Sequence, residues 1–312
     1  MSLGPGTSEL TPTMVDPPHL PARTEVVRQQ FDQRAARLPQ HEALLREVDR
    51  RLMERLDLVK LAPRSIVDVG CGGGASEPAL RARYPQALWT GVDLSLAQLR
   101  RIALPAARFW RAPRLRRVAA EAGALPLAAG SVDLVYSNLM LHWHPAPHGV
   151  FPEWLRVLRV DGLLLFSCLG PDTLRELRAA CAAALPLARP LPFVDMHDFG
   201  DMMVASGFAA PVMDTERITL TYPSAAALLR EVGALGGNPR DDRAAHLPSG
   251  RQARALLAAL AARAGADGRI ALTFEVAYGH AWKPAPRAPG GAVALETLRQ
   301  TLPSRGGGPA RR

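Results

Sequence analysis

Apolar residues follow two alternating patterns along most of the chain. Short runs rich in β-branched residues, typical of buried strands, are separated by longer stretches in which apolar residues recur every three or four positions, as in helices. Because strands that alternate with helices form right-handed βαβ units, we expect an α/β fold with a mostly parallel sheet and helices on both faces. Seven strands are predicted, at residues 65–70, 88–93, 115–119, 132–137, 163–168, 212–221 and 270–280.

Helical patterns also precede the first strand and lengthen the later connections. Helices are predicted at residues 24–38, 41–60, 75–83, 95–103, 148–158, 173–185, 197–206 and 224–264. The segments at 171–200 and 224–266 are too long for simple connections between neighbouring elements. We therefore expect them to form a helical lid over the edge of the sheet where such folds bind ligands.

The two ends of the chain differ from the part between them. Residues 1–24 are rich in proline, glycine, serine and threonine, and residues 285–312 in proline, glycine and arginine. Segments of this composition cannot bury enough apolar surface to offset the entropy lost on folding. We expect a disordered N-terminal segment, one folded domain over residues 25–284 and a disordered basic tail.

The first predicted strand ends in a glycine-rich turn. Residues 65–74 read SIVDVGCGGG, and helix-forming residues follow. Glycines let a backbone approach a ligand closely. The dinucleotide signature G-x-G-x-x-G would need its third glycine where Ala75 stands, which weakens a pyrophosphate site. The spacing of Asp68, Gly70 and Gly72 fits better the D-x-G-x-G loop of S-adenosylmethionine (SAM) methyltransferases.

A second acid supports this interpretation. Asp93 ends the next predicted strand, nineteen residues after Gly74. Rossmann-like folds place a carboxylate there that holds ribose hydroxyls. The alternative is a glycine-rich surface turn followed by an unrelated aspartate. The loop, the spaced acid and the later strands together disfavour that alternative.

Composition and charge exclude several partners. The net charge of +9 comes almost wholly from arginine, since Lys60 and Lys283 are the only lysines. No basic run is interleaved with aromatic residues, which make up 5% of the chain, so we expect no nucleic-acid partner. A positive surface favours an acidic protein partner instead.

Cysteine usage and hydropathy indicate the compartment. The three cysteines cannot all pair, which indicates a reduced, intracellular protein. No apolar stretch is long enough to span a bilayer, and residues 1–24 lack the apolar core of a secretory signal. We expect a cytoplasmic protein without a membrane span. His142 and His144 have no further ligand at metal-binding spacing, so no metal site is predicted.

Several segments resemble one family of class I methyltransferases, the malonyl-acyl-carrier-protein O-methyltransferases of biotin synthesis. The resemblance covers about residues 26–284. It departs at Leu38, where the family usually has tyrosine, and at Glu121, where it usually has aspartate. The similar segments are RAAR at 34–37, VDVGCG at 67–72, ALPL at 124–127, SNL at 137–139, HW at 142–143 and LTFEV at 272–276.

This resemblance implies a cofactor, a substrate and roles for named residues. The cofactor would be SAM, and the substrate a malonyl thioester on acyl carrier protein, whose free carboxylate is methylated. Two helices before the first strand commonly cover the cofactor in such enzymes, but the sequence alone favours a plain packing role for them. The implied cofactor contacts are the loop residues Asp68, Gly70 and Gly72, Asp93 at the ribose, Leu94, Glu121 and Ala122 at the adenine, and Asn138 at the cofactor ammonium.

The substrate side is less defined by the sequence. An ionised carboxylate needs no general base at neutral pH, and the sequence offers no clear base, so no catalytic residue is assigned. A malonyl carboxylate would suit an arginine clamp. Arg175 and Arg217, in or beside the predicted lid, are the candidates, and His142 at the end of the fourth strand is a candidate substrate contact.

Two other functions remain open from the sequence. Residues 169–177 and 141–143 also resemble the mitochondrial complex I assembly factors, which share the fold and are linked to arginine hydroxylation of a respiratory subunit. A SAM-binding assembly factor would not methylate malonyl thioesters. A nucleotide-dependent oxidoreductase is the remote alternative, and NAD rather than SAM should then protect the protein from unfolding.

Overall fold

A computed structural model describes residues 22–37, 42–104, 114–185, 187–240 and 248–286. Most of the two segments predicted to be disordered, at 1–24 and 285–312, therefore lies outside the described residues, as does Leu38. No helix in the described ranges is long and apolar enough to cross a membrane.

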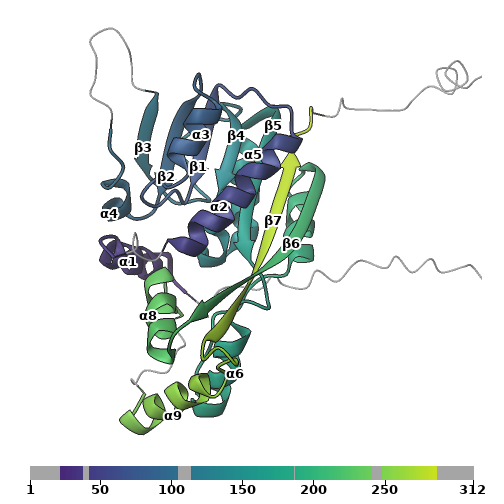
Figure 1. Ribbon diagram of the computed structural model, residues 1–312. Coiled ribbons are helices and arrows are strands. Elements are labelled where there is room, and N and C mark those ends of the chain that lie inside the picture. The colour runs from purple at the N-terminus through teal and green to yellow at the C-terminus, as the bar shows by residue number, and fades with distance from the viewer. Residues whose placement is uncertain (1–21, 38–41, 105–113, 186, 241–247, 287–312) are drawn as a thin grey trace, which may run out of the picture.

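The described chain folds around one seven-stranded sheet with the order β3-β2-β1-β4-β5-β7-β6 (Figure 1). The first five strands in sequence run parallel, and β7 runs antiparallel to both of its neighbours. The mostly parallel sheet predicted from the sequence is confirmed. The strands are β1 (Ser65–Val69), β2 (Leu88–Asp93), β3 (Leu115–Ala119), β4 (Val132–Ser137), β5 (Leu158–Leu169), β6 (Ala209–Tyr222) and β7 (Ile270–Trp282).

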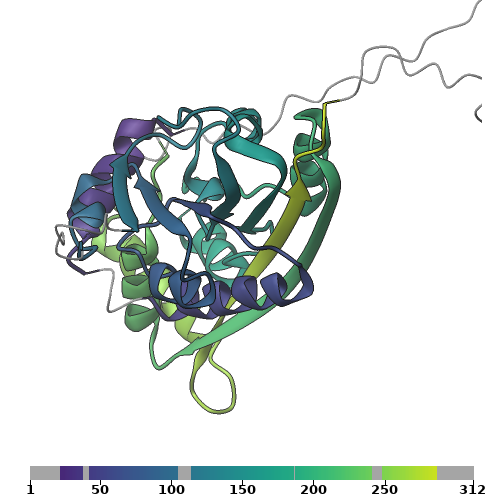
Figure 2. The ribbon, with the colours of Figure 1, turned by 90° about the horizontal axis from the view of Figure 1, so that it is seen from above.

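Two strands differ in length from the prediction. β5 begins at Leu158 rather than 163. The turn expected at Asp161 is instead an irregularity within the strand, where the register with β4 shifts between Val132 and Leu134. The pairing of β5 with β7 ends at Val276, whereas β6 and β7 stay paired as far as Ile270. The β6–β7 hairpin therefore extends beyond the sheet, and from above its strands run side by side along one side of the molecule (Figure 2).

Helices form where the sequence predicts them, with shorter bounds. Serine side chains cap three of them: Ser95 and Ser224 accept from a backbone N–H in the first turn, and Ser249 forms a capping box with Gln252. The helices are α1 (Thr24–Arg34), α2 (Ala43–Arg55), α3 (Glu77–Arg83), α4 (Leu96–Leu99), α5 (Val150–Val157), α6 (Arg175–Ala184), α7 (Met196–Ala205), α8 (Ala225–Leu235) and α9 (Gly250–Ala261), with short 3-10 turns η2 (Leu56–Leu58), η3 (Leu141–Trp143) and η4 (Pro147–Gly149).

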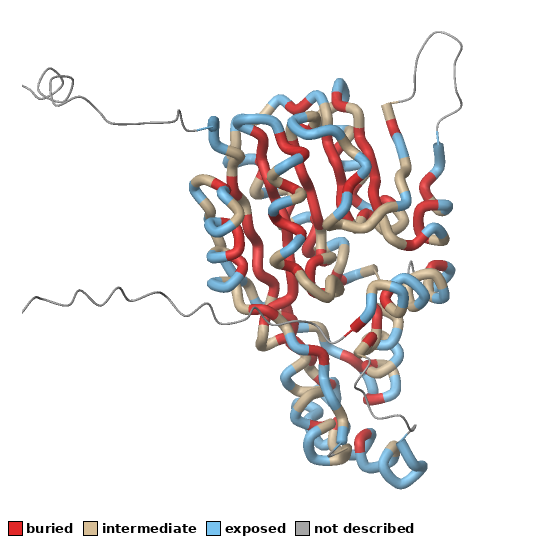
Figure 3. Tube along the Cα trace, turned by 180° about the vertical axis from the view of Figure 1, so that it is seen from behind, coloured by how far each residue is buried: buried red, intermediate tan, exposed pale blue. Residues whose placement is uncertain are grey.

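Alternate strand residues supply the two faces of the core. Ile66 and Leu134 pack with residues of α2 and α3, whereas Val67 and Val135 pack with residues of α5 and α7. The strands of the sheet are accordingly the most continuously buried part of the chain (Figure 3). Burying each large apolar side chain contributes about 1.5–3 kcal/mol, which makes this double-sided core the main source of stability.

Most of the predicted lid lies around the extended hairpin. α6 contacts α9 and β7, and α8 contacts α9 and both hairpin strands (Figure 1). α7 behaves differently, because it packs on β6 and β7 and its Phe199 is fully buried beside Phe151 and Phe166. The end of the segment predicted as lid at 171–200 thus belongs to a layer that covers the sheet.

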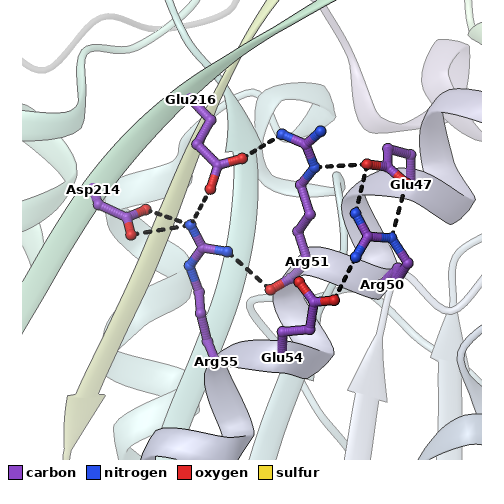
Figure 4. A network of polar contacts seen from close by, with 7 residues as sticks. All are labelled: Glu47, Arg50, Arg51, Glu54, Arg55, Asp214 and Glu216. Atoms are coloured by element: carbon purple, nitrogen blue, oxygen red, sulfur yellow. Dashed lines mark hydrogen bonds and ion pairs between the residues drawn. The ribbon is translucent and has the colours of Figure 1, made fainter.

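A network of charged residues joins α2 to β6 (Figure 4). Arg55 donates to both carboxylate oxygens of Asp214, at 2.9 and 3.0 Å, and to Glu216 at 2.9 Å. Arg51 also bonds Glu216, and its other partner is Glu47 on its own helix. The guanidinium of Arg55 lies 3.5 Å from the centre of the Tyr278 ring. These contacts hold α2 against the strands of the hairpin.

Candidate cofactor and substrate site

A pocket lies at the carboxyl ends of β1, β2 and β4, the edge where open α/β sheets bind ligands. Gly70, Asp93 and Asn138 follow or end these strands and line it. The pocket opens to solvent at its mouth, and about 1340 Å³ of empty space lies in the pocket and mouth together. The predicted cofactor residues that line it are Gly70, Gly72, Asp93, Leu94, Glu121, Ala122 and Asn138.

The glycine turn needs glycine at two positions for different reasons. Gly70 has φ +74°, and a Cβ there would lie 2.3 Å from the side chain of Met140. Gly72 has φ +53°, and a Cβ there would meet no protein atom within 4 Å. The backbone of Gly72 therefore borders open space in the pocket, as a loop that receives a ligand closely would require.

Asp93 is fixed by backbone donors at the end of β2. One carboxylate oxygen accepts from the N–H of Gly72 at 2.8 Å, and the other accepts from the N–H of Ser95 at 2.7 Å. Burial raises the pKa of Asp93 to about 6, against the effect of these two bonds. Each oxygen has a second lone pair, so the ionised group is able to accept from ribose hydroxyls.

Asp68 lies beneath the glycine turn rather than on the pocket wall. It is 1% exposed, and its Oδ2 has no hydrogen-bond partner among the described residues. Burial, and then the charges of Asp49 and Asp93, raise its pKa well above the usual value. Asp68 does not line the pocket, and its role in ordering the loop stays a prediction.

Asp49, a buried carboxyl that links elements around this turn, was not predicted from the sequence. Asp49 on α2 accepts hydrogen bonds from Ser76 Oγ and Tyr136 OH, both at 2.6 Å. Burial raises its pKa. This carboxyl links α2, the helix start after the glycine turn and β4, three elements that the sequence separates widely.

Glu121 lies at the predicted adenine end. One of its oxygens lies 2.5 Å from His144 Nε2, and the other accepts from the N–H of Gly123 at 2.8 Å. The hydrogen bond with His144 lowers the pKa of Glu121. His144 also lines the pocket, although the sequence analysis did not place it among the cofactor contacts. Leu94 and Ala122 form apolar wall beside this carboxylate.

The side chain of Asn138 forms hydrogen bonds within the protein. Its Oδ1 accepts from Ser167 Oγ at 2.7 Å, and its Nδ2 donates to the carbonyl of Leu45 at 3.1 Å. These bonds fasten the end of β4 to β5 and α2. The predicted contact with the cofactor ammonium would therefore use the backbone carbonyl of Asn138.

Comparisons with known proteins agree with this geometry. Residues 67–166 match the family model described as a methyltransferase domain. A malonyl-[acyl-carrier protein] O-methyltransferase of Laribacter hongkongensis is 46% identical over 84% of this chain and 90% of its own length. One from a Methylovorus species is 42% identical over 84% and 89%. The chain belongs to this methyltransferase family.

The fold and the cofactor follow from the family. A solved putative methyltransferase of Bacillus halodurans, 17% identical, superposes with a TM-score of 0.52 over 76% of this chain and 99% of its own. The Rossmann-like class I fold predicted from the sequence is thus confirmed, and SAM is the cofactor of this methyltransferase. The open backbone at Gly72 and the fixed carboxylate of Asp93 fit that cofactor.

The three residues predicted to contact the substrate lie in different environments. His142 is 6% exposed and lines the pocket, and burial lowers its pKa to about 3, so the ring is neutral. Arg175 pairs with Glu176 at 3.1 Å, and Arg217 pairs with Asp172 at 2.7 Å. Both arginines are exposed and neither lines the pocket. Their role as a carboxylate clamp remains a prediction.

Two helices that precede the sheet contribute to the pocket of the methyltransferase. Thr24, Val27 and Phe31 of α1 line it, as do Leu44 and Leu45 of α2. The opposite wall includes residues of α8, and Arg34 of α1 donates to the carbonyl at the α8 terminus. The first two helices therefore line the pocket, α2 also packs on the sheet, and their covering of the cofactor stays a prediction.

Metal ligands are not gathered near this pocket. Within the described ranges, no group of three or more histidine, cysteine, aspartate or glutamate side chains is arranged to hold a metal ion. The neutral His142 lies 3.8 Å from Cys168 Sγ instead, inside the core.

Proposed function

We propose that this methyltransferase transfers the methyl group of SAM to the free carboxylate of a malonyl thioester on acyl carrier protein, as in biotin synthesis. The observation that carries the proposal is the identity of 46% and 42% to proteins with that name, over 84% of this chain. The substrate is a cytoplasmic metabolite carrier, so the proposed reaction belongs in the cytoplasm.

The chemistry of the pocket supports a carboxylate acceptor. When bound, SAM supplies a methyl group already activated on a positively charged sulfur. A carboxylate is ionised at neutral pH, so no side chain has to remove a proton from it. His142 is neutral and buried, and Glu121 is engaged by His144 and Gly123, which suits a reaction that depends on positioning.

The remaining protein groups would orient the two reactants and exclude water. Gly70, Gly72 and Asp93 would hold the methionine and ribose parts of the cofactor, while the apolar walls would surround the acceptor. A low-polarity site strengthens the attraction between the acceptor carboxylate and the cofactor charge. The helices around the hairpin, α6, α8 and α9, would close over the pair as a lid.

The carrier protein is the proposed partner because it is acidic and brings the acyl group on a long flexible arm. A chain with net charge +9 attracts such a partner over a distance, and the attraction should weaken with salt. Raising the ionic strength should therefore raise KM for malonyl-acyl carrier protein more than KM for malonyl-pantetheine.

The test is transfer of labelled methyl from SAM to malonyl-acyl carrier protein, with acetyl-acyl carrier protein as the control that lacks the free carboxylate. Label on the malonyl form alone is expected. Absence of transfer, with SAM binding measured in the same sample, would favour the assembly-factor alternative. Protection from unfolding by NAD but not by SAM would favour the oxidoreductase alternative.

A further inference from the structure

Two leucines that line the pocket have a left-handed backbone. φ is +52° at Leu139 and +58° at Leu174. Among the described residues other than glycine, only Asp161 and Ala210 also have positive φ, and neither lines the pocket. This conformation is costly for an L-residue and persists where neighbouring contacts impose it, frequently at functional sites.

Hydrogen bonds on both sides impose the backbone of Leu174. Before it, Thr173 Oγ1 donates to the carbonyl of Glu275 at 3.0 Å and accepts from the N–H of Glu275 at 3.1 Å. Leu174 N–H donates to the carbonyl of Thr273 at 2.7 Å. After it, Glu176 accepts from the N–H and Oγ1 of Thr273 at 2.9 and 2.6 Å. The chain passes from β5 into α6 at the residue between these anchors, whose partners Thr273 and Glu275 belong to β7.

Leu139 is held in a similar way at the end of β4. Its N–H donates to Ser167 Oγ at 3.0 Å and to the carbonyl of Ser167 at 3.2 Å. Ser167 Oγ in turn donates to Asn138 Oδ1. The strand end is therefore tied to β5 in the one conformation that directs the chain past the pocket.

Glycine would adopt both conformations without steric cost, yet leucine occupies both positions. Each leucine adds apolar wall: Leu139 belongs to the buried cluster that contains Leu169 and Phe274, and Leu174 packs against that cluster. All four line the pocket. They come from the ends of β4 and β5, from β7 and from the residue before α6.

The order of the strands separates these walls from the cofactor contacts. Gly72 and Asp93 follow or end β1 and β2, on one side of β4, whereas β5 and β7 lie on the other side. Leu174, which is bonded to β7, thus belongs to the half of the pocket that remains for the methyl acceptor when SAM occupies the half near β1 and β2. Leu139 follows β4 and lies at the boundary between the two halves.

We propose that Leu139 and Leu174 determine the length of the acyl chain that this acceptor half admits. The inference rests on the proposed function, in which a single methylene separates the carboxylate from the thioester. Fixed walls of this kind would accept the malonyl group and disfavour succinyl and glutaryl groups, which are one and two methylenes longer. Discrimination by one methylene in an apolar site typically reaches about 10- to 200-fold.

The test compares Leu174→Gly and Leu139→Gly with the wild-type chain on malonyl-, succinyl- and glutaryl-acyl carrier protein. Glycine removes the wall and also suits the backbone, so both variants should fold. We expect the ratio of kcat/KM for glutaryl to that for malonyl to rise at least about tenfold in at least one variant. Affinity for SAM should stay within about twofold of wild type.

Two further variants distinguish the effect of the missing side chain from the effect of a relaxed backbone. Leu174→Ala removes most of the side chain but keeps a β-carbon, and it should shift selectivity in the same direction with lower thermal stability than Leu174→Gly. Ala210→Gly relaxes a positive φ of 48° at an exposed residue away from the pocket, and it should leave selectivity unchanged.

The outcome can be separated from failure of the proposed function. Binding of malonyl- and glutaryl-pantetheine to the protein with S-adenosylhomocysteine needs no turnover, and its ratio of Kd values should shift in the same variants. A wild-type protein that does not methylate any acyl thioester contradicts the proposed function. If the ratios of Kd and of kcat/KM are unchanged in the leucine variants, the proposal that these leucines determine the acyl-chain length is wrong. It is also wrong if the variants lose SAM affinity and keep the selectivity of the wild type.

Discussion

The N–H of Gly72 donates a hydrogen bond to the carboxylate of Asp93, with 2.8 Å between Gly72 N and Asp93 Oδ2. The bond joins the glycine turn after β1 to the end of β2. Because Ser95 N–H engages the other oxygen, the carboxylate is oriented before a ligand binds. Preorganisation of this kind reduces the entropy lost on binding, so a small change at Asp93 should affect the cofactor strongly.

Replacement of Asp93 by alanine should weaken SAM binding by about 3 kcal/mol, roughly a hundredfold in Kd. The variant loses the acceptor for the ribose hydroxyls and also releases the Gly72 N–H. Isothermal titration would measure Kd, and circular dichroism would verify the fold. Asp201→Ala, at an exposed position of α7 outside the pocket, is the matched control. Equal SAM affinity in Asp93→Ala and wild type would remove Asp93 from the site.

SAM affinity should fall in mildly acidic solution. The pKa of Asp93 is raised to about 6, chiefly by burial, and a protonated carboxyl accepts hydrogen bonds poorly. A pKa near 6 implies that Kd for SAM rises by about tenfold between pH 7 and pH 5. Titration over this range would test it, and Asp93→Asn should show weak binding with little pH dependence. A flat profile in the wild-type protein would contradict the prediction.

Ionisation of Asp93 should lower the stability of the ligand-free protein, whereas it raises the affinity for SAM. The folded-state pKa of about 6 lies above the usual aspartate value, so the native state binds more protons than the unfolded state between about pH 4 and pH 6. Its contribution is complete below about pH 4 and is lost as the pH rises through 6, with a size of about 2–3 kcal/mol. Urea unfolding of wild type and Asp93→Asn across this range would reveal a difference that grows with pH.

Gly72→Ala should separate ligand binding from folding. Gly72 and Gly130 have φ of +53° and +63°, and an added Cβ meets no protein atom within 4 Å at either position. Both alanine variants should therefore lose about 1–2 kcal/mol of stability from the left-handed backbone. Only Gly72 lines the pocket, so only its variant should lose SAM affinity, by at least about tenfold. Similar SAM affinities in both variants would show that the turn does not contact the cofactor.

The sheet and its glycine turn could be predicted because their causes are local. β-branched runs predict buried strands, and Asp93 ends such a run, which places it at the ligand edge of any parallel sheet. The start of β5 could not be predicted, because the irregular register opposite Val132 depends on pairing with β4. Nor does the sequence of β6 reveal that its hairpin with β7 extends beyond the sheet.

The site was predicted less completely because much of it depends on distant contacts. Phe31 and Trp143 both line the pocket, with ring centres 5.4 Å apart in an edge-to-face arrangement, although one belongs to α1 and the other to the turn after β4. Leu174 has no local signal for a left-handed backbone, since leucine rarely adopts it and the anchors come from β7. Roles for Arg175 and Arg217 as a clamp rest on the chemistry of the implied carboxylate substrate and on the position of both arginines in or beside the predicted lid.

In the charged network of α2 and β6, one arginine should contribute to the stability of the fold and another should contribute little. The Arg55 side chain is 17% exposed and bonds two carboxylates of β6, whereas that of Arg50 is 54% exposed and bonds only glutamates of its own helix. Exposed pairs within a helix contribute little, because solvent screens them and the side chains lose entropy. Removal of Arg55 takes this cation from Asp214 and leaves Glu216 paired with Arg51 alone.

Arg55→Met should therefore lower the free energy of unfolding by about 2 kcal/mol, and Arg50→Met should leave it nearly unchanged. Urea denaturation with equal m-values in all three proteins would measure both effects. Because α2 lines the pocket through Leu44 and Leu45, SAM affinity should also fall in Arg55→Met, and an unchanged affinity would mean that the network stabilises the hairpin without positioning α2.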